Sequence, residues 1–133
     1  MTFKTLMVLK ALVCLLFGIG FLFFPRALLS LFGVDLGMGG TFPAREYGAA
    51  LFGNLMLTWF ARNAAVPAET NKCPALRAII LALFVYDAIG VVVTLAAMAA
   101  GIVNPLGWLA VVIYLFFAVG FGYYLVKKPE AKA

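Results

Sequence analysis

Histidine is absent from this 133-residue chain, and charged residues make up only 11% of it. Without histidine, the chain lacks the side chain that most often serves as a general base and as a metal ligand. The two cysteines lie in different settings, Cys14 in an apolar run and Cys73 in a polar connection, so neither a disulfide nor a cysteine-rich metal site is expected. Ser30 is the sole serine, and no base accompanies it. We therefore predict no catalytic residues, no metal site and no enzymatic activity.

Apolar residues dominate the composition: the chain is 66% hydrophobic, with a mean hydropathy of +1.12. A soluble globular chain is about half apolar and about a quarter charged, and a chain this short has little interior in which to bury the excess. The composition indicates an integral membrane protein whose first partner is the lipid bilayer. The net charge of +5 does not indicate nucleic acid binding, because the basic residues mostly flank apolar runs.

Four apolar runs are long enough to cross a bilayer as helices, since about 20 residues span the hydrocarbon core. They cover residues 6–24, 44–61, 76–100 and 106–126. Residues 26–33 are apolar but too few to span, and we expect them to lie at the membrane interface. The short connections predict an all-α, polytopic membrane protein with one domain, an antiparallel bundle of four transmembrane helices.

The basic residues predict the orientation of this bundle. Eight of the ten lie on the side of the two termini, and two lie on the other side. The eight are Lys4, Lys10, Arg62, Lys72, Arg77, Lys127, Lys128 and Lys132, and the two are Arg26 and Arg45. Because cytoplasmic segments are enriched in Lys and Arg, both termini are expected in the cytoplasm. Lys10 lies within the first turns of its run, and its long side chain is expected to reach the headgroups.

Small residues recur at helical spacing along the last three runs. Such residues let helix backbones approach closely in lipid, so the faces that carry them are expected to pack against protein. The residues assigned to helix packing are Ala49, Gly53, Gly90, Thr94, Ala97, Gly107, Ala118 and Gly122. Pro43 is expected at the start of the second helix, after a flexible glycine-rich connection. The third helix is expected to pack tightly after Asp87 and loosely before it.

Asp87 lies near the middle of the third run, where an ionisable side chain is costly and marks a functional site or an interhelical clamp. Asn54 and Tyr114 lie near the middle of their own runs, at depths that agree within about one helical turn. We therefore expect these three side chains to meet. A protonated Asp87 donating to Asn54 and a carboxylate accepting from Tyr114 both fit. The cluster is either a clamp that fixes helix register or a site for a proton, an ion or a ligand.

A second polar group, Arg45, Glu46 and Tyr47, lies at the outer end of the second run. One interpretation is an interfacial ion pair beside an aromatic anchor. The other is that Arg45 grips a lipid phosphate or an anionic ligand, with Glu46 at the mouth of a cavity.

Three short motifs resemble one family: Phe-Phe-Pro at 23–25, Arg-Glu-Tyr-Gly at 45–48 and Asn-Pro-Leu-Gly-Trp at 104–108. Together, over most of the chain, they resemble the small bacterial four-helix membrane proteins of the DoxX-like type. The resemblance implies a four-helix fold in a bacterial inner (plasma) membrane. Relatives of this type are linked to membrane-associated redox or thiol-stress complexes, some of them with quinone-linked chemistry. The resemblance would imply a similar role for this chain. This chain lacks a cysteine pair for such a redox role.

Two classes of function follow as hypotheses. The first is a non-enzymatic accessory subunit of a membrane complex, or a homo-oligomer, which acts through helix–helix contacts with other subunits or with itself. The alternative is a carrier or binding protein for a lipid, a quinone or another apolar small molecule, with Asp87 and Asn54 at the closed end of its pocket. No other cofactor is expected. A small proton-coupled channel or transporter is a third hypothesis.

Overall fold

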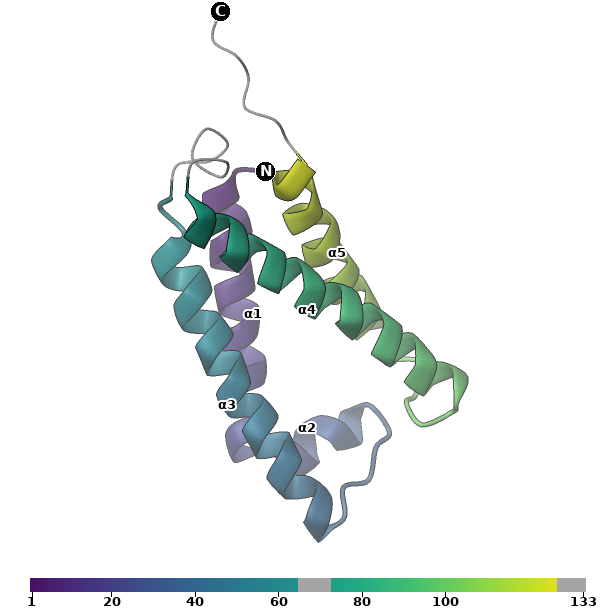
Figure 1. The fold of residues 1–133 in the computed structure, drawn as a ribbon. Coiled ribbons are helices and arrows are strands. Elements are labelled where there is room, and N and C mark those ends of the chain that lie inside the picture. The colour runs from purple at the N-terminus through teal and green to yellow at the C-terminus, as the bar shows by residue number, and fades with distance from the viewer. Residues whose placement is uncertain (65–72, 127–133) are drawn as a thin grey trace, which may run out of the picture.

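A computed structural model describes residues 1–64 and 73–126 of the chain. These residues form five helices and no strand: α1 (Phe3–Phe23), α2 (Pro25–Leu31), α3 (Met38–Ala61), α4 (Pro74–Ala99) and α5 (Gly107–Val126) (Figure 1). Three of them, α1, α4 and α5, are long and apolar enough to cross a membrane. The structure therefore supports an all-helical, multi-pass membrane protein.

A threonine cap and two prolines mark the ends of α1, α2 and α4. The hydroxyl of Thr2 accepts a hydrogen bond from the Thr5 backbone N–H at 3.2 Å and caps α1. Pro25 ends α1 and begins α2, because proline cannot continue a helix but fits its first turn. Pro74 begins α4 in the same way.

The start of α3 differs from the sequence-based expectation, which placed Pro43 at the first position of the helix. The helix begins at Met38, and Pro43 lies inside it. The Gly40 backbone N–H donates to the Gly37 carbonyl at 3.1 Å and closes the first turn. Pro43 is the sixth residue of α3, beyond the first four N–H groups that have no partner within a helix, so it removes one backbone hydrogen bond, to the Gly39 carbonyl, within the first two turns. The glycines expected to form a flexible connection therefore help to start the helix.

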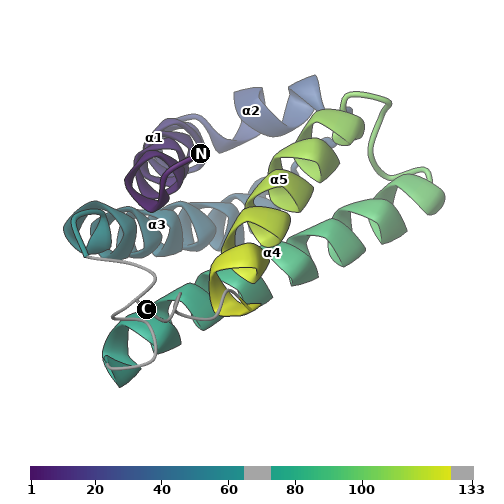
Figure 2. The same ribbon diagram turned by 90° about the horizontal axis from the view of Figure 1, so that it is seen from above.

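The long helices form two antiparallel pairs, with α1 along α3 and α4 along α5 (Figure 1). The α4/α5 pair is inclined to the α1/α3 pair (Figure 2), so the two pairs lie close at one end and diverge toward the other (Figure 1). We call these the closed end and the wide end. The closed end holds the start of α1 and the end of α5, and α2 lies across the wide end.

The main apolar core fills the closed end and joins α1, α4 and α5. Its buried residues are Phe3, Leu6, Met7, Leu76, Ile80, Leu83, Phe117, Phe121 and Tyr124. In α4, the last fully buried residue is Asp87. The expectation that α4 packs tightly after Asp87 and loosely before it is therefore wrong. The half after Asp87 lies where the two pairs diverge, so it has less to pack against.

The α4/α5 contact uses the small residues that the sequence assigned to it. A Cβ atom on Gly90 would lie 2.6 Å from the Tyr114 ring, and one on Gly122 would lie 3.2 Å from the Phe84 ring. Other members of the set are buried or half-buried between the same helices: Thr94, Ala97, Gly107 and Ala118. These glycines thus let an aromatic ring of one helix lie directly on the backbone of the other.

The small residues predicted on α3 do not pack within the chain. Ala49 and Gly53 are exposed, and no atom lies within 4 Å of a Cβ placed on Gly53. The contact with α1 is made one position earlier, at Gly48, where a Cβ would lie 2.8 Å from the Leu22 nitrogen and 3.1 Å from the Gly18 carbonyl oxygen. The buried face of α3 is therefore a neighbouring ridge of the helix.

The basic residues that predicted the orientation divide between the two ends. Lys4 and Arg77 lie at the starts of α1 and α4, at the closed end, and Arg62 follows the end of α3. Arg26 in α2 and Arg45 near the start of α3 lie toward the wide end. Four further members lie outside the described residues: Lys72, Lys127, Lys128 and Lys132.

Candidate functional site

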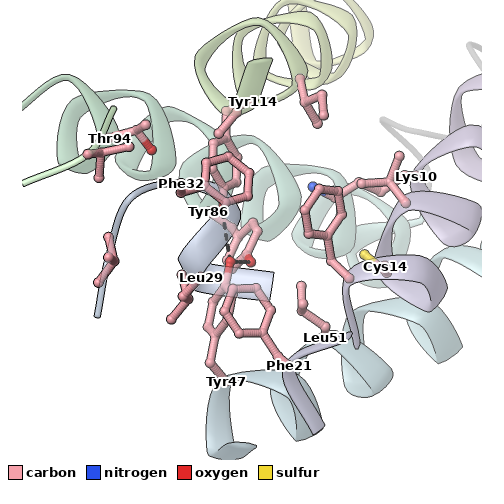
Figure 3. Close-up of a pocket in the computed structure, with 16 residues that line it drawn as sticks. Lys10, Cys14, Phe21, Leu29, Phe32, Tyr47, Leu51, Tyr86, Thr94 and Tyr114 are labelled. Carbon is pink, nitrogen blue, oxygen red and sulfur yellow. Dashed lines mark hydrogen bonds between the residues drawn. The ribbon is translucent and has the colours of Figure 1, made fainter. Parts of the chain in front are cut away.

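A cavity of about 190 Å³ lies between the two helix pairs, and all five helices contribute to its wall (Figure 3). Most of its lining is apolar: Val13, Phe17, Phe21, Leu29, Phe32, Val34, Leu51, Val103, Ala110 and Ile113. Its polar or ionisable lining residues are Lys10, Cys14, Tyr47, Tyr86, Thr94 and Tyr114. For scale, an engineered apolar cavity of about 150 Å³ binds benzene. The cavity can therefore hold a ring or a short stretch of chain.

A buried ion pair borders this cavity. The Lys10 ammonium in α1 donates to the Asp87 carboxylate oxygen Oδ1 in α4. The two side chains are 2% and 0% exposed. The Lys10 Nζ atom also lies 4.7 Å from the centre of the Phe117 ring and 4.9 Å from that of Tyr86, contacts that favour a cation. Opposite charges in contact are tolerated in an apolar interior, where a single charge is not.

The pair confirms that Asp87 faces protein, and it corrects the expected partners. Asn54 does not reach Asp87: it is half-exposed, and its side chain has no hydrogen bond within the part of the chain that the structure describes. Its backbone carbonyl accepts from the buried Thr58 hydroxyl at 2.8 Å. Tyr114 lies near the pair, with Lys10 Nζ 6.0 Å from its ring centre, but its hydroxyl bonds elsewhere.

Lys10 is the residue of the candidate site whose position the sequence predicted wrongly. It does not extend to the headgroups, because its side chain turns inward to Asp87. The other oxygen of Asp87, Oδ2, is buried and has no hydrogen-bond partner among the described residues. The available signal was simple: Lys10 and Asp87 are the two charged residues that lie well inside apolar runs, and their charges are opposite.

Three tyrosines from α3, α4 and α5 meet at the cavity wall. The Tyr47 hydroxyl lies 2.7 Å from that of Tyr114 and is also hydrogen-bonded to that of Tyr86. Figure 3 shows the three side chains converging, with Lys10 and Cys14 on the wall formed by α1. We call Tyr47, Tyr86 and Tyr114 the tyrosine cluster. It links α3 to the α4/α5 pair at a second point, beyond the ion pair.

The group predicted at the outer end of the second run is divided by the fold. Tyr47 points into the cavity, whereas Arg45 and Glu46 are exposed. Neither charged residue forms an ion pair with any other described residue. Tyr47 is therefore part of the candidate site, although the sequence grouped it with its two charged neighbours at the outer end of the run.

Asn104 ties the wide end together. Its side-chain amide donates to the Leu31 carbonyl at 2.8 Å, and its backbone N–H donates to the Phe32 carbonyl at 2.9 Å. Its side-chain oxygen accepts from the Leu106 backbone N–H at 2.9 Å, the kind of bond expected of a helix cap. Phe32 and Val103, beside these bonds, line the cavity. Asn104 thus holds α2 against the turn that enters α5.

The remaining groups offer little reactive chemistry. Cys14 is buried at the cavity wall, Cys73 is exposed, and both are free thiols. Within residues 1–64 and 73–126, no group of three His, Cys, Asp or Glu side chains could hold a metal ion. The Thr94 hydroxyl donates to the Gly90 carbonyl in its own helix at 2.8 Å. The site is best suited to hold an apolar body and to hydrogen-bond one polar end.

In comparisons with known proteins, no family model, no curated protein and no solved structure matches the chain.

Proposed function

We propose that the protein binds an apolar small molecule of the membrane, such as a lipid, in the cavity between its two helix pairs, as a carrier or binding protein. The observation that supports this proposal is the cavity itself, with mostly apolar walls and a few polar groups among them. Ligand sites typically combine an apolar lining with a small number of placed polar groups that set orientation. A clamp between helices needs the polar groups but not the space.

The membrane arrangement that goes with this function has four crossing helices. The α3 helix is less apolar than the other three, but it has 24 residues. At 1.5 Å per residue it is about 36 Å long, which exceeds the hydrocarbon core of about 30 Å. It lies antiparallel to α1, so α1 and α4 begin at the same end. Both termini would lie in the cytoplasm, as the distribution of Lys and Arg predicts, and the membrane would be the inner membrane of a bacterium, as the resemblance to DoxX-like proteins implies.

The test is to identify and quantify the small molecules that copurify with the protein in lipid nanodiscs, by mass spectrometry. Ala110→Phe places a ring in the cavity, whereas Val112→Phe places the same ring on the exposed outer face of α5. We expect Ala110→Phe to lower the amount of bound molecule severalfold and Val112→Phe to leave it unchanged. Equal retention by both variants, or a wild-type protein that carries nothing, would count against binding in this cavity.

Self-association is a second candidate, because α3 presents an unusual outer face. Ala49, Ala50 and Gly53 are exposed there, with Glu46 exposed at one end of the face and Asn54 half-exposed. Small residues in a membrane commonly pack against another helix, and polar side chains rarely face lipid. A second copy or another subunit would cover this face without blocking the cavity.

Disulfide crosslinking in membranes tests this second candidate. Ala49→Cys in a Cys73→Ser background should form a covalent dimer on oxidation if two copies meet along α3. Val92→Cys, on the exposed face of α4, serves as the matched control. Crosslinking that is equally efficient at both positions, or absent at Ala49→Cys, would speak against a specific contact along α3.

A further inference from the structure

The tyrosine cluster has one more hydrogen-bond donor than it uses. Each hydroxyl carries a single proton. The two bonds within the cluster, from Tyr47 to Tyr86 and from Tyr47 to Tyr114, consume two of the three protons, whichever atom donates. No other described residue accepts a hydrogen bond from these hydroxyls. One O–H group is therefore left to donate to whatever occupies the cavity.

Lys10 adds to this surplus of donors. An ammonium has three N–H groups, and one of them bonds to Asp87. The others face a surrounding of aromatic rings, those of Phe117 and Tyr86, with no second oxygen acceptor among the described residues. Thr94, the remaining hydroxyl of the lining, already spends its proton on a backbone carbonyl. The polar side chains of the cavity thus leave at least one O–H group free to donate to an acceptor on a bound molecule.

The charge at this part of the cavity is already balanced. Lys10 and Asp87 neutralise each other while almost fully shielded from solvent. A carboxylate ligand would compete with Asp87 for Lys10 and leave one negative charge without a partner. An ammonium ligand would compete with Lys10 for Asp87 and leave one positive charge without a partner. Because an unpaired buried charge is strongly unfavourable, the site disfavours ligands of either sign.

Building on the proposed binding function, we infer that the cavity recognises a neutral molecule whose polar end is an oxygen acceptor, such as a carbonyl. The acceptor receives the spare O–H of the tyrosine cluster, and the apolar remainder lies along the wall. A volume of about 190 Å³ limits the enclosed part to a ring or a short chain end. Fatty acids and long-chain amines are disfavoured by charge, although the ends of their apolar chains would fit.

Four probes that share one chain and differ at one end test this inference: 2-dodecanone, dodecane, dodecanoate and dodecylammonium. Each is titrated into nanodiscs that hold protein labelled at the isoleucine methyl groups, and binding is followed by NMR. Ile113 lines the cavity and reports binding there, whereas exposed Ile89 reports probe dissolved in the lipid. One net hydrogen bond corresponds to about a three- to tenfold difference in affinity. We expect the ketone to bind that much more tightly than dodecane, and both charged probes to bind more weakly than dodecane.

Phenylalanine variants test the assignment to the tyrosine cluster. Each single variant, Tyr47→Phe, Tyr86→Phe or Tyr114→Phe, still leaves at least one spare O–H, so the preference for the ketone should persist. The triple variant has none, and its preference should fall toward that of dodecane while its helical content and Ile89 signals stay unchanged. A triple variant that keeps the full preference would overturn the role of the cluster.

The outcomes separate this inference from the function on which it rests. If dodecane or dodecanoate shifts Ile113 as strongly as the ketone does, the inference is wrong and the binding function stands. If no probe shifts Ile113 beyond its effect on Ile89, the binding function itself fails.

Discussion

The Lys10 ammonium of α1 and the Asp87 carboxylate of α4 form a buried ion pair that joins the two helix pairs of the protein. The partners are 77 positions apart in the chain. The pair lies where the apolar core of the closed end gives way to the cavity. A buried pair contributes little net stability compared with apolar residues of similar volume, but it disfavours arrangements that separate its charges. Its main consequence is therefore to fix which face of α1 meets α4.

The first prediction concerns the loss of one partner of this pair. Lys10→Met and Asp87→Leu, made singly, should each lower the free energy of unfolding by about 3–5 kcal/mol, because each leaves a buried charge unpaired. The double variant should lie within about 1 kcal/mol of wild type, since it removes both charges and keeps the volume. Denaturant unfolding in detergent micelles measures all three.

Lys4→Met provides the control for the first prediction, because Lys4 lies on the same helix and is exposed. It should change stability by no more than about 0.5 kcal/mol. If the two single effects simply add in the double variant, the charges do not interact, and the pairing is wrong.

The second prediction compares two glycines of α3. Gly48→Ala should destabilise the protein by about 1–3 kcal/mol, because the new methyl group would meet the backbone of α1 at 2.8 Å. Gly53→Ala should be neutral or mildly stabilising, since the space around it is open and alanine favours helix. Thermal unfolding in one detergent compares the two. Equal effects would show that α1 and α3 do not meet at Gly48.

The helices and the membrane class could be predicted from the sequence because both depend on local composition. An apolar segment of about 20 residues forms a helix in lipid, because a helix satisfies its backbone hydrogen bonds within the segment. Short connections then favour antiparallel neighbours. Which face of a helix becomes buried is harder to predict, because a shift of one position along the chain turns the direction of the side chain by about 100°. On α3 that difference separates the predicted Ala49 from the observed Gly48.

Depth along the helices does not by itself identify the partners at the site, because they also depend on how the helix pairs are inclined. Asn54 and Tyr114 were chosen as partners of Asp87 on the assumption of upright helices with equal depths. The inclined α4 instead brings Asp87 to the side chain of Lys10. The cavity arises because the inclined helix pairs diverge. No single segment of the sequence predicts that divergence. Tyr47 joined the site for this reason, although its charged neighbours are exposed.

The third prediction concerns the contact that holds the wide end. Asn104→Ala removes the bond to the Leu31 carbonyl and the cap at Leu106. Hydrogen exchange of the backbone amides in residues 25–34 should rise about tenfold, as the loss of about 1.4 kcal/mol predicts. Asn104→Asp keeps the acceptor for Leu106 but loses the donor to Leu31, so exchange should rise while α5 stays capped.

Asn63→Ala is the control for the third prediction, because Asn63 is exposed at the other end of the molecule. It should leave exchange in residues 25–34 unchanged. If Asn104→Ala also leaves it unchanged, the contact between α2 and the turn before α5 does not hold the wide end closed.

The fourth prediction concerns orientation, and Cys73 provides a natural probe. It is exposed just before α4, at the closed end, whereas Cys14 is 1% exposed and should not react. If the closed end faces the cytoplasm, a membrane-impermeant maleimide should label Cys73 only after cells are permeabilised. Asp35→Cys in a Cys73→Ser background places a thiol in the connection between α2 and α3, at the wide end. That thiol should be labelled in intact cells.

The two thiols together also test whether α3 crosses the membrane. They lie at opposite ends of α3, so a crossing α3 requires opposite labelling patterns. Labelling of Cys73 alone in intact cells would mean that the bundle is inverted, with the basic residues outside. The same result at both positions in intact cells, either labelling of both or protection of both, would mean that α3 does not cross and that three helices alone span the bilayer. In that case α3 would not carry Tyr47 into the bilayer to meet Tyr86 and Tyr114, and the cavity would not be embedded in the membrane.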